Sequence, residues 1–140
     1  LRAIFYTGPF LTFELGVFVV WPLTAGGLLT LAPIYDALRA RGYAEENECV
    51  TIEGVPVQFL PADNALVEEA LTAARESSYE DVQVRVVSSE YLLAISLQTG
   101  RDKDRERVRI LREQANLDEG SLADILKRHQ LGERWKQWTA

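Results

Sequence analysis

Hydrophobic and polar positions divide the first half of the chain into strands joined by turns. Four runs predict strands: residues 15–21, 48–52, 55–60 and 82–87. The first run is apolar on both faces, as in a central strand, whereas the last alternates valine with polar residues and predicts one exposed face. Glu53-Gly54 separates the second and third runs and suits the type I′ turn of a β-hairpin.

Helical periodicity dominates the second half of the chain. Three segments carry apolar residues at helical spacing: residues 90–98, 104–115 and 122–131. Two shorter helices are expected earlier, one from Pro33 to the cap at Gly42 and one capped by Asp63 or Asn64. Residues 1–7 are expected to end a helix, because a glycine and a proline follow them.

We therefore expect an α+β fold, in which a mixed sheet with flanking helices is followed by a C-terminal helical bundle. Residues 1–87 are expected to form the α/β core, and residues 88–140 the helical part of the same domain. The side chains expected to be buried are those of Val17, Val19, Ile52, Val57, Phe59, Leu92, Ile95, Leu111, Leu122 and Ile125. The sequence contains no methionine, so we expect it to begin inside a longer natural frame, with the core incomplete at its N-terminus.

The composition narrows the classes of function. A chain of 140 residues, 47% hydrophobic, is long enough for one domain with a buried core. The net charge of −6 argues against broad nucleic-acid binding, which needs clustered lysine and arginine. The apolar run 17–23 is interrupted by Pro22 and is much shorter than a membrane span of about 20 residues. The single cysteine, Cys49, is expected to be a core residue of a cytoplasmic protein.

Candidate chemistry lies at the start of the first predicted strand. Residues i and i+2 of a strand project from the same face, so an acid-x-acid pair there can hold divalent metal ions against a triphosphate. Glu14 occupies the first of these positions, but Gly16 offers no side chain at the second. The matching position on a later strand is Gln58, which carries an amide and not a carboxylate.

A second candidate site surrounds the start of the helix that follows Gly100. Arg101 and Lys103 can face a phosphate there, beside the N-terminus of the helix. The alternative is that Asp102 or Asp104 caps the helix while the basic side chains are solvated.

Three further features favour structural roles. His129 has no second histidine in the chain and is expected to have neither a metal-binding nor a catalytic role. Glu68-Glu69 is interpreted as a solvated helix face. Trp135 and Trp138 are expected to pack at the end of the domain, or alternatively to anchor an interface with a partner.

Several of these segments, in their order and spacing, resemble one known family. The matching pieces are Gly8-Pro9, Glu14-Leu15-Gly16-Val17-Phe18-Val19, residues 33–43, Ile52-Glu53-Gly54-Val55-Pro56-Val57-Gln58, residues 90–95 and Thr99-Gly100-Arg101-Asp102-Lys103-Asp104. Together they resemble the nucleotidyltransferases of the DNA-polymerase-beta-like superfamily, in particular the small bacterial type found as abortive-infection and toxin–antitoxin components. The resemblance covers nearly the whole chain.

The resemblance implies a set of functional residues that this chain only partly carries. The family pattern has an acid-x-acid pair on the first strand, a third acid on the later strand, and an upstream Gly-Ser turn that holds the triphosphate. Glu14 is one methylene longer than the usual aspartate, and Gly16 and Gln58 replace the other two acids. The Gly-Ser turn would fall before Leu1. In the helical half, a lysine often seen in the family is Ser96 here, whereas the Arg-x-Lys-Asp segment from residue 101 matches.

The function that the resemblance implies is transfer of a nucleoside monophosphate from a nucleoside triphosphate to a protein or RNA acceptor, with weak or lost activity. Mg²⁺ and the triphosphate would be its cofactors, with Glu14 as the remaining metal ligand. Glu14 and Gln58 would occupy the catalytic positions, and Arg101 and Lys103 would contact the nucleotide. The alternative is a non-catalytic module that binds a nucleotide, an antitoxin-like protein partner or a second copy of itself.

Overall fold

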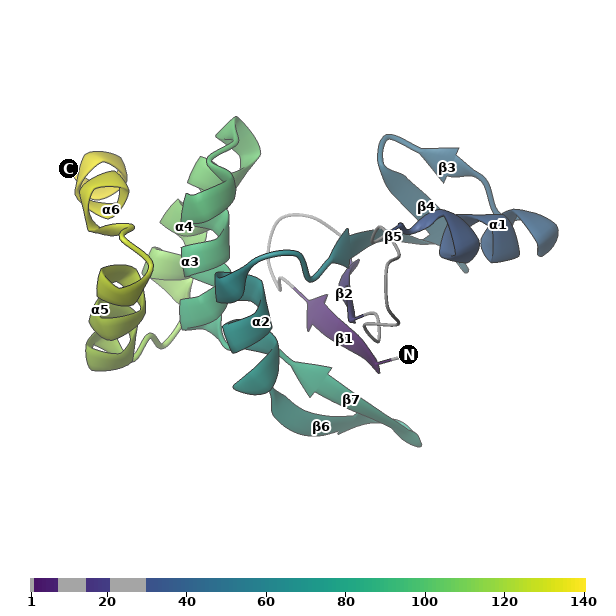
Figure 1. Ribbon diagram of the computed structural model, residues 1–140, viewed down its shortest axis with the longest axis horizontal. Helices are drawn as coiled ribbons and strands as arrows, with labels where there is room; N and C mark the ends of the chain where they lie inside the picture. The colour runs from purple at the N-terminus through teal and green to yellow at the C-terminus, as the bar shows by residue number, and fades with distance from the viewer. Residues whose placement is uncertain (1, 8–14, 21–29) are drawn as a thin grey trace. The chain divides into compact units, whose positions relative to one another are not determined.

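The computed structural model describes residues 2–7, 15–20 and 30–140 and has an α+β fold with a mixed sheet (Figure 1). The expected fold class is thus confirmed. Contacts between residues divide the chain into two compact units. Unit 1 comprises Leu1–Asp63 and Glu76–Val86, and unit 2 comprises Asn64–Arg75 and Val87–Ala140.

Unit 1 is built on the sheet, with one helix, α1 (Ala32–Ala40), in its described residues. The strands described are β1 (Arg2–Thr7), β2 (Leu15–Val20), β3 (Glu45–Glu46), β4 (Cys49–Ile52), β5 (Val55–Pro61), β6 (Arg75–Tyr79) and β7 (Val82–Val86). Their order in the sheet is β3-β4-β5-β2-β1-β7-β6. β2 lies inside the sheet, antiparallel to β1 and parallel to β5. The apolar first run is therefore a central strand, as expected.

The expectation that residues 1–7 end a helix is wrong, because β1 is a strand. Its backbone pairs with β2 from Arg2 opposite Val20 to Thr7 opposite Leu15. On its other side, Phe5 lies opposite Val86 of β7 in a parallel pair. Isoleucine, phenylalanine, tyrosine and threonine fill residues 4–7, and these residue types are enriched in strands. The glycine and proline that follow mark the end of an element but do not determine its type.

The core of unit 1 gathers on β2, β4 and β5. Among the residues of unit 1 whose burial the structure describes, the buried side chains on these strands are those of Val17, Phe18, Val19, Cys49, Val50 and Val57. Successive residues of β2 are buried, so both faces of this strand are covered. Two side chains that were expected to be buried, Ile52 and Phe59, are half-exposed. Ile52 adjoins the hairpin turn, and Phe59 packs edge-on against Tyr35 of α1, with ring centroids 5.9 Å apart.

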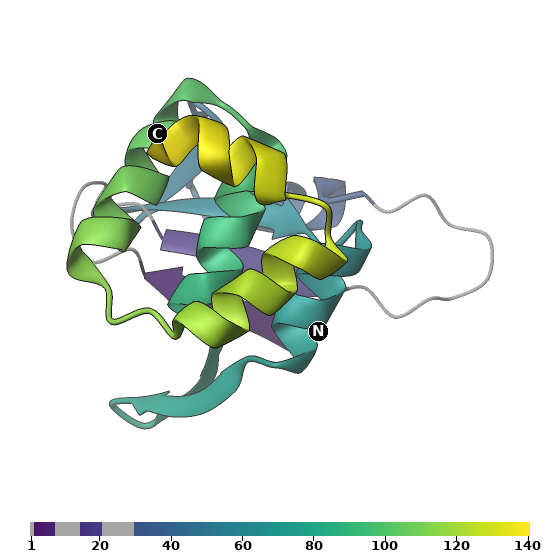
Figure 2. The same ribbon diagram turned by 90° about the vertical axis from the view of Figure 1, so that its left-hand side faces the viewer.

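Unit 2 is helical, and Figure 2 shows its helices from a second direction. They are α2 (Ala65–Thr72), α3 (Ser89–Thr99), α4 (Asp102–Gln114), α5 (Glu119–Arg128) and α6 (Gly132–Thr139). Residues 92–97 of α3 are all buried, because α2, α4 and α5 contact this helix. Leu92, Ile95, Leu111, Leu122 and Ile125 are buried as expected. No helix in the part of the chain that the structure describes is long and apolar enough to cross a membrane.

Side-chain caps fix where three of these helices begin. The carboxamide oxygen of Asn64 accepts a hydrogen bond from the Val67 amide at 3.0 Å, and Asp118 accepts one from the Ser121 amide at 2.8 Å. Ser88 begins α3 in the same way. The sequence offered Asp63 and Asn64 as alternative caps for α2, and Asn64 is the one that forms the bond.

Gly100 ends α3 in a left-handed conformation, and the guanidinium group of Arg134 lies close to it. Its φ is +70°, and a Cβ built on it would lie 2.9 Å from Nη1 of Arg134. That nitrogen donates hydrogen bonds to the carbonyl oxygens of Leu97 at 2.6 Å and Gln98 at 3.1 Å. Arg134 therefore satisfies carbonyl groups that the end of α3 leaves without helical partners.

Gly100→Ala is expected to destabilise the protein more than Gly42→Ala, measured by urea unfolding. Gly42 is a matched control because its φ is +89° but nothing lies within 4 Å of a Cβ built there. The left-handed conformation alone costs an alanine about 1–2 kcal/mol. At Gly100 the displaced Arg134 hydrogen bonds add about 1 kcal/mol. Equal losses at both positions would show that Arg134 is not held in place.

Candidate functional site

Two candidate positions of unit 1, Gly16 and Gln58, lie next to each other. In the family that the sequence resembles, these positions carry the second and third acids. β2 and β5 run parallel, and their register places Gly16 opposite Gln58 and Val17 opposite Phe59. Residues in register on neighbouring strands share a face of the sheet, so Gly16 and Gln58 lie side by side on one face. Phe59 packs against α1 on the other face. Glu14, the predicted metal ligand, lies outside the described residues.

Of the residues that the structure describes at this position, Gly16 and Gln58 do not by themselves supply the ligands that a Mg²⁺ ion needs. Mg²⁺ takes an octahedral shell of oxygen ligands and is usually held in proteins by one or two carboxylates. Gly16 contributes no side chain, and Gln58 contributes at most the neutral oxygen of a half-buried amide. Within residues 2–7, 15–20 and 30–140, no group of three or more histidine, cysteine, aspartate or glutamate side chains is placed to hold a metal ion.

The charge of the chain is unevenly divided between the two units. By sequence, unit 1 holds 10 of the 21 acidic residues but only 4 of the 15 basic ones, whereas unit 2 holds 11 of each. The whole net charge of −6 therefore belongs to unit 1. A net charge of this sign repels a triphosphate unless cations accompany it.

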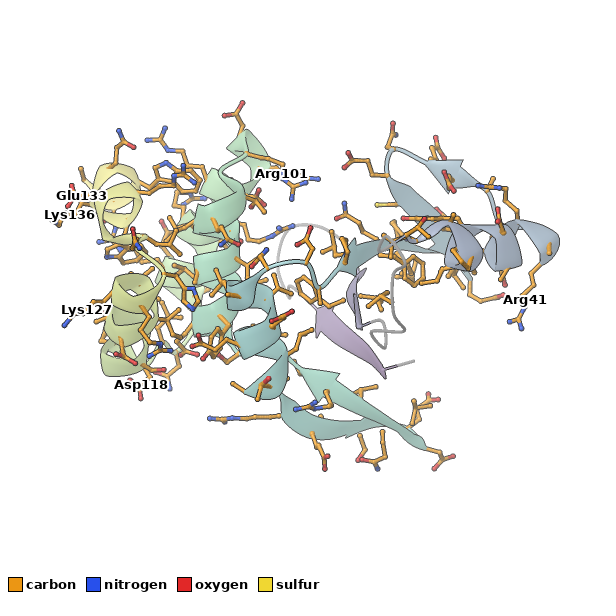
Figure 3. The ribbon with its side chains drawn as sticks, in the orientation of Figure 1. Arg41, Arg101, Asp118, Lys127, Glu133 and Lys136 are labelled. Atoms are coloured by element: carbon orange, nitrogen blue, oxygen red, sulfur yellow. The ribbon has the colours of Figure 1, made fainter. Side chains whose placement is uncertain are left out.

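Arg101, a predicted nucleotide ligand, is engaged by a buried carboxylate in unit 2. Its Nε donates to Asp104 Oδ2 at 2.7 Å, at the start of α4 (Figure 3). Arg107 Nη1 donates to Oδ1 of the same carboxylate at 3.0 Å, and the Thr99 hydroxyl donates to Oδ2 at 2.7 Å. The Asp104 side chain is only 1% exposed. Burial favours its neutral form, but the hydrogen bonds from Arg101 and Thr99 outweigh burial and lower the pKa of Asp104.

Lys103, the other predicted nucleotide ligand, is exposed on the first turn of α4. Both residues belong to unit 2, and Gly16 and Gln58 belong to unit 1. The implication of the resemblance that Gln58, Arg101 and Lys103 serve one nucleotide site therefore stays a prediction. Ser96, at the position of the family's lysine, is 1% exposed, and its hydroxyl donates to the Leu92 carbonyl at 2.9 Å.

A cluster that the sequence analysis missed joins three helices of unit 2 at Glu69. Its Oε1 accepts a hydrogen bond from the Tyr91 hydroxyl at 2.7 Å and another from Arg128. Its Oε2 lies 2.7 Å from Nε2 of His129. Glu69 is thus not the solvated helix face that was expected. Because 60 residues separate it from His129, no local pattern could have paired the two.

The hydrogen bonds to Glu69 determine its charge and that of its surroundings. Partial burial favours the neutral acid, but hydrogen bonds from Tyr91, Arg128 and His129 outweigh it and lower the pKa of Glu69 to about 2. The carboxylate is therefore ionised at neutral pH and can only accept, so His129 Nε2 must carry the proton of this bond. Burial and the neighbouring carboxylate together raise the pKa of the Tyr91 hydroxyl.

Neither a protein-family model nor a curated protein matches this chain.

Proposed function

We propose that this chain is a nucleotidyltransferase-like protein in which transfer of a nucleoside monophosphate from a nucleoside triphosphate to a protein or RNA acceptor is weak or lost. The observation that carries the proposal is the register of β2 and β5, which places Gly16 directly opposite Gln58. The resembling family needs two acids on neighbouring strands at this place. In this chain the two paired positions carry a glycine and an amide.

The chemistry of these two residues supports weak or lost transfer over full activity. Phosphoryl-group transfer depends on positioning and on stabilisation of charge, which metal ions held by carboxylates supply. Replacing a carboxylate by an amide removes a negative charge, and replacing one by glycine also removes the ligand atom. The excess of acidic residues in unit 1 gives a bound triphosphate no compensating attraction.

The same observation favours a second candidate, a non-catalytic module. A sheet with neutral residues at the two positions where the family has acids can still bind a nucleotide or a protein partner at the same end. The two candidates differ in turnover and agree in binding, so one assay of each separates them.

A transfer assay tests the proposal on the unmodified protein. Each of the four ribonucleoside triphosphates, labelled at the α-phosphate, is incubated with the protein, Mg²⁺ or Mn²⁺, and either mixed RNA or a mixture of proteins as acceptor. We expect label on the acceptors to stay near background, with an active nucleotidyltransferase as the positive control. Rapid, metal-dependent labelling would contradict the proposal. Triphosphate binding without labelling would select the non-catalytic module.

A further inference from the structure

A polar groove of about 720 Å³ lies in unit 2, where the end of α3, the α5–α6 turn and α6 meet. Its polar lining includes Gln98, His129, Gln130, Arg134, Lys136 and Gln137. The acidic residue in the lining is Glu133, whose carboxylate is paired with Lys136 at 2.8 Å; both project from α6 (Figure 3). The groove thus combines cationic groups and amide donors, which are the groups that bind anions in proteins.

Arg134 is held in place by hydrogen bonds that use only one of its three nitrogen atoms. Its Nη1 makes the bonds to the Leu97 and Gln98 carbonyls, and neutral carbonyl oxygens leave the guanidinium charge uncompensated. Within the described residues, its Nε and Nη2 make no hydrogen bond. A guanidinium that is already oriented presents two parallel donors to a tetrahedral oxyanion at little entropic cost.

His129 lines the groove at the end of α5, and one of its two ring nitrogens, Nε2, is already bonded to Glu69. Its side chain is 13% exposed, and Nε2 bonds to the ionised Glu69. The charged and titratable groups around this pair are Glu69 on α2, Tyr91 on α3, Asp124 and Arg128 on α5, and Glu133, Arg134 and Lys136 on α6.

Gln130 occupies a backbone conformation that glycine would adopt more easily. Its φ is +56°, at the position after the α5 cap, and Leu131 N bonds back to the Leu126 carbonyl at 2.8 Å. Helices that end in this way usually place glycine there, because a Cβ strains the left-handed conformation. The glutamine side chain at this position lines the groove.

We propose that this groove binds a phosphate group, free or as the phosphate of a nucleotide, through Arg134, Lys136, Gln130 and His129. Arg134 supplies the fixed donor pair, and Lys136 exchanges its exposed partner Glu133 for the anion. His129, whose Nε2 bonds to Glu69, lies between Glu69 and the anion. The residues of this site belong to unit 2, whereas Gly16 and Gln58 belong to unit 1, and its existence does not depend on the proposed transferase resemblance.

The single histidine of the chain makes the test direct. His129 is the only histidine in the sequence, so its imidazole signals are identified in NMR spectra without assignment. The full chain is titrated with inorganic phosphate, sulfate, a nucleoside monophosphate and the matching nucleoside without phosphate. We expect the first three to shift the His129 signals saturably. Sulfate serves as a second tetrahedral anion whose charge does not change near neutral pH.

The variants separate binding from folding. His129→Gln, Arg134→Lys and Lys136→Gln should each weaken phosphate binding about tenfold, the loss typical of one hydrogen bond to a charged group, read by calorimetry. Lys127→Gln removes an exposed charge of α5 outside the groove and should leave affinity unchanged. Gln130→Gly should raise the midpoint of thermal unfolding while weakening phosphate binding, which a purely structural role for Gln130 would not produce.

Each outcome of these titrations either supports the phosphate site or overturns it. Equal affinity for phosphate and the monophosphate identifies free phosphate as sufficient, and tighter binding of the monophosphate identifies a nucleotide; both support the site. The proposal is overturned if no anion binds saturably, if the nucleoside without phosphate binds as well as its monophosphate, or if Lys127→Gln weakens binding as much as Arg134→Lys.

Discussion

Asp104→Asn is expected to destabilise the protein by about 2–4 kcal/mol, one of the two largest effects predicted for this chain. The carboxylate is buried and accepts hydrogen bonds from Arg101, Arg107 and Thr99. An amide of the same shape loses the charge and turns one acceptor into a donor that faces two guanidinium groups. Urea unfolding at neutral pH measures the loss.

Asp102→Asn is the matched control for this prediction. Asp102 lies in the first turn of the same helix but is exposed, so its loss costs only the interaction with the helix dipole, about 0.3–1 kcal/mol. Because the folded-state pKa of Asp104 is lowered, its contribution is fully present above the unfolded pKa of about 3.9 and disappears as the pH falls through the folded value. Asp104→Asn should remove this part of the acid sensitivity. A loss no larger than that of Asp102→Asn would contradict the description of Asp104 as a buried ion pair.

Gly16→Asp combined with Gln58→Asp is expected to create Mg²⁺-dependent triphosphate binding where the unmodified chain has little. The register of β2 and β5 places the two new carboxylates side by side on one face of the sheet. Two carboxylates supply the oxygen ligands that a hard cation requires, and the bound cation then attracts the triphosphate. Without metal the like charges repel each other, so the variant should be less stable by roughly 1 kcal/mol.

The single substitutions and a neutral pair are the controls for this double variant. Gly16→Asp or Gln58→Asp alone adds one carboxylate. We expect the gains in metal affinity of the two single variants, added together, to be much smaller than the gain of the double variant. Gly16→Asn combined with Gln58→Asn has nearly the same shape as the acidic pair but no charge, and it should gain none. Circular dichroism of each variant establishes that the sheet is intact before binding is measured.

Local signals in the sequence predicted the parts of the fold that depend on few neighbours. The hairpin turn is an example: Glu53 and Gly54 have φ values of +49° and +83°, the left-handed pair that a type I′ turn requires. Residues 1–7 were misread because their conformation is decided by pairing with β2 and β7, which the preceding and following residues do not reveal. Burial was overestimated for Ile52, which ends a short strand beside the turn, and for Phe59, which meets Tyr35 of α1 edge-on and keeps part of its surface exposed.

The candidate sites divide in the same way. By sequence, Gln58 is the position on a later strand that matches the family's third acid, and the register of β2 and β5 pairs it with Gly16. For Arg101 the sequence left two alternatives, and the short spacing to Asp104 allowed the ion pair that forms. The cluster at Glu69 depends on three helices meeting, so its residues are far apart in the sequence and carry no joint signal.

The most direct test of the central claim is isothermal calorimetry of Mg²⁺ with a non-hydrolysable nucleoside triphosphate, performed on the unmodified protein and on the Gly16→Asp, Gln58→Asp double variant. The claim that the acidic site has been lost at Gly16 and Gln58 predicts weak, metal-independent heats for the unmodified chain and tight, metal-dependent binding for the double variant. Tight, Mg²⁺-dependent binding by the unmodified chain would contradict it, because other residues would then have to supply the metal ligands.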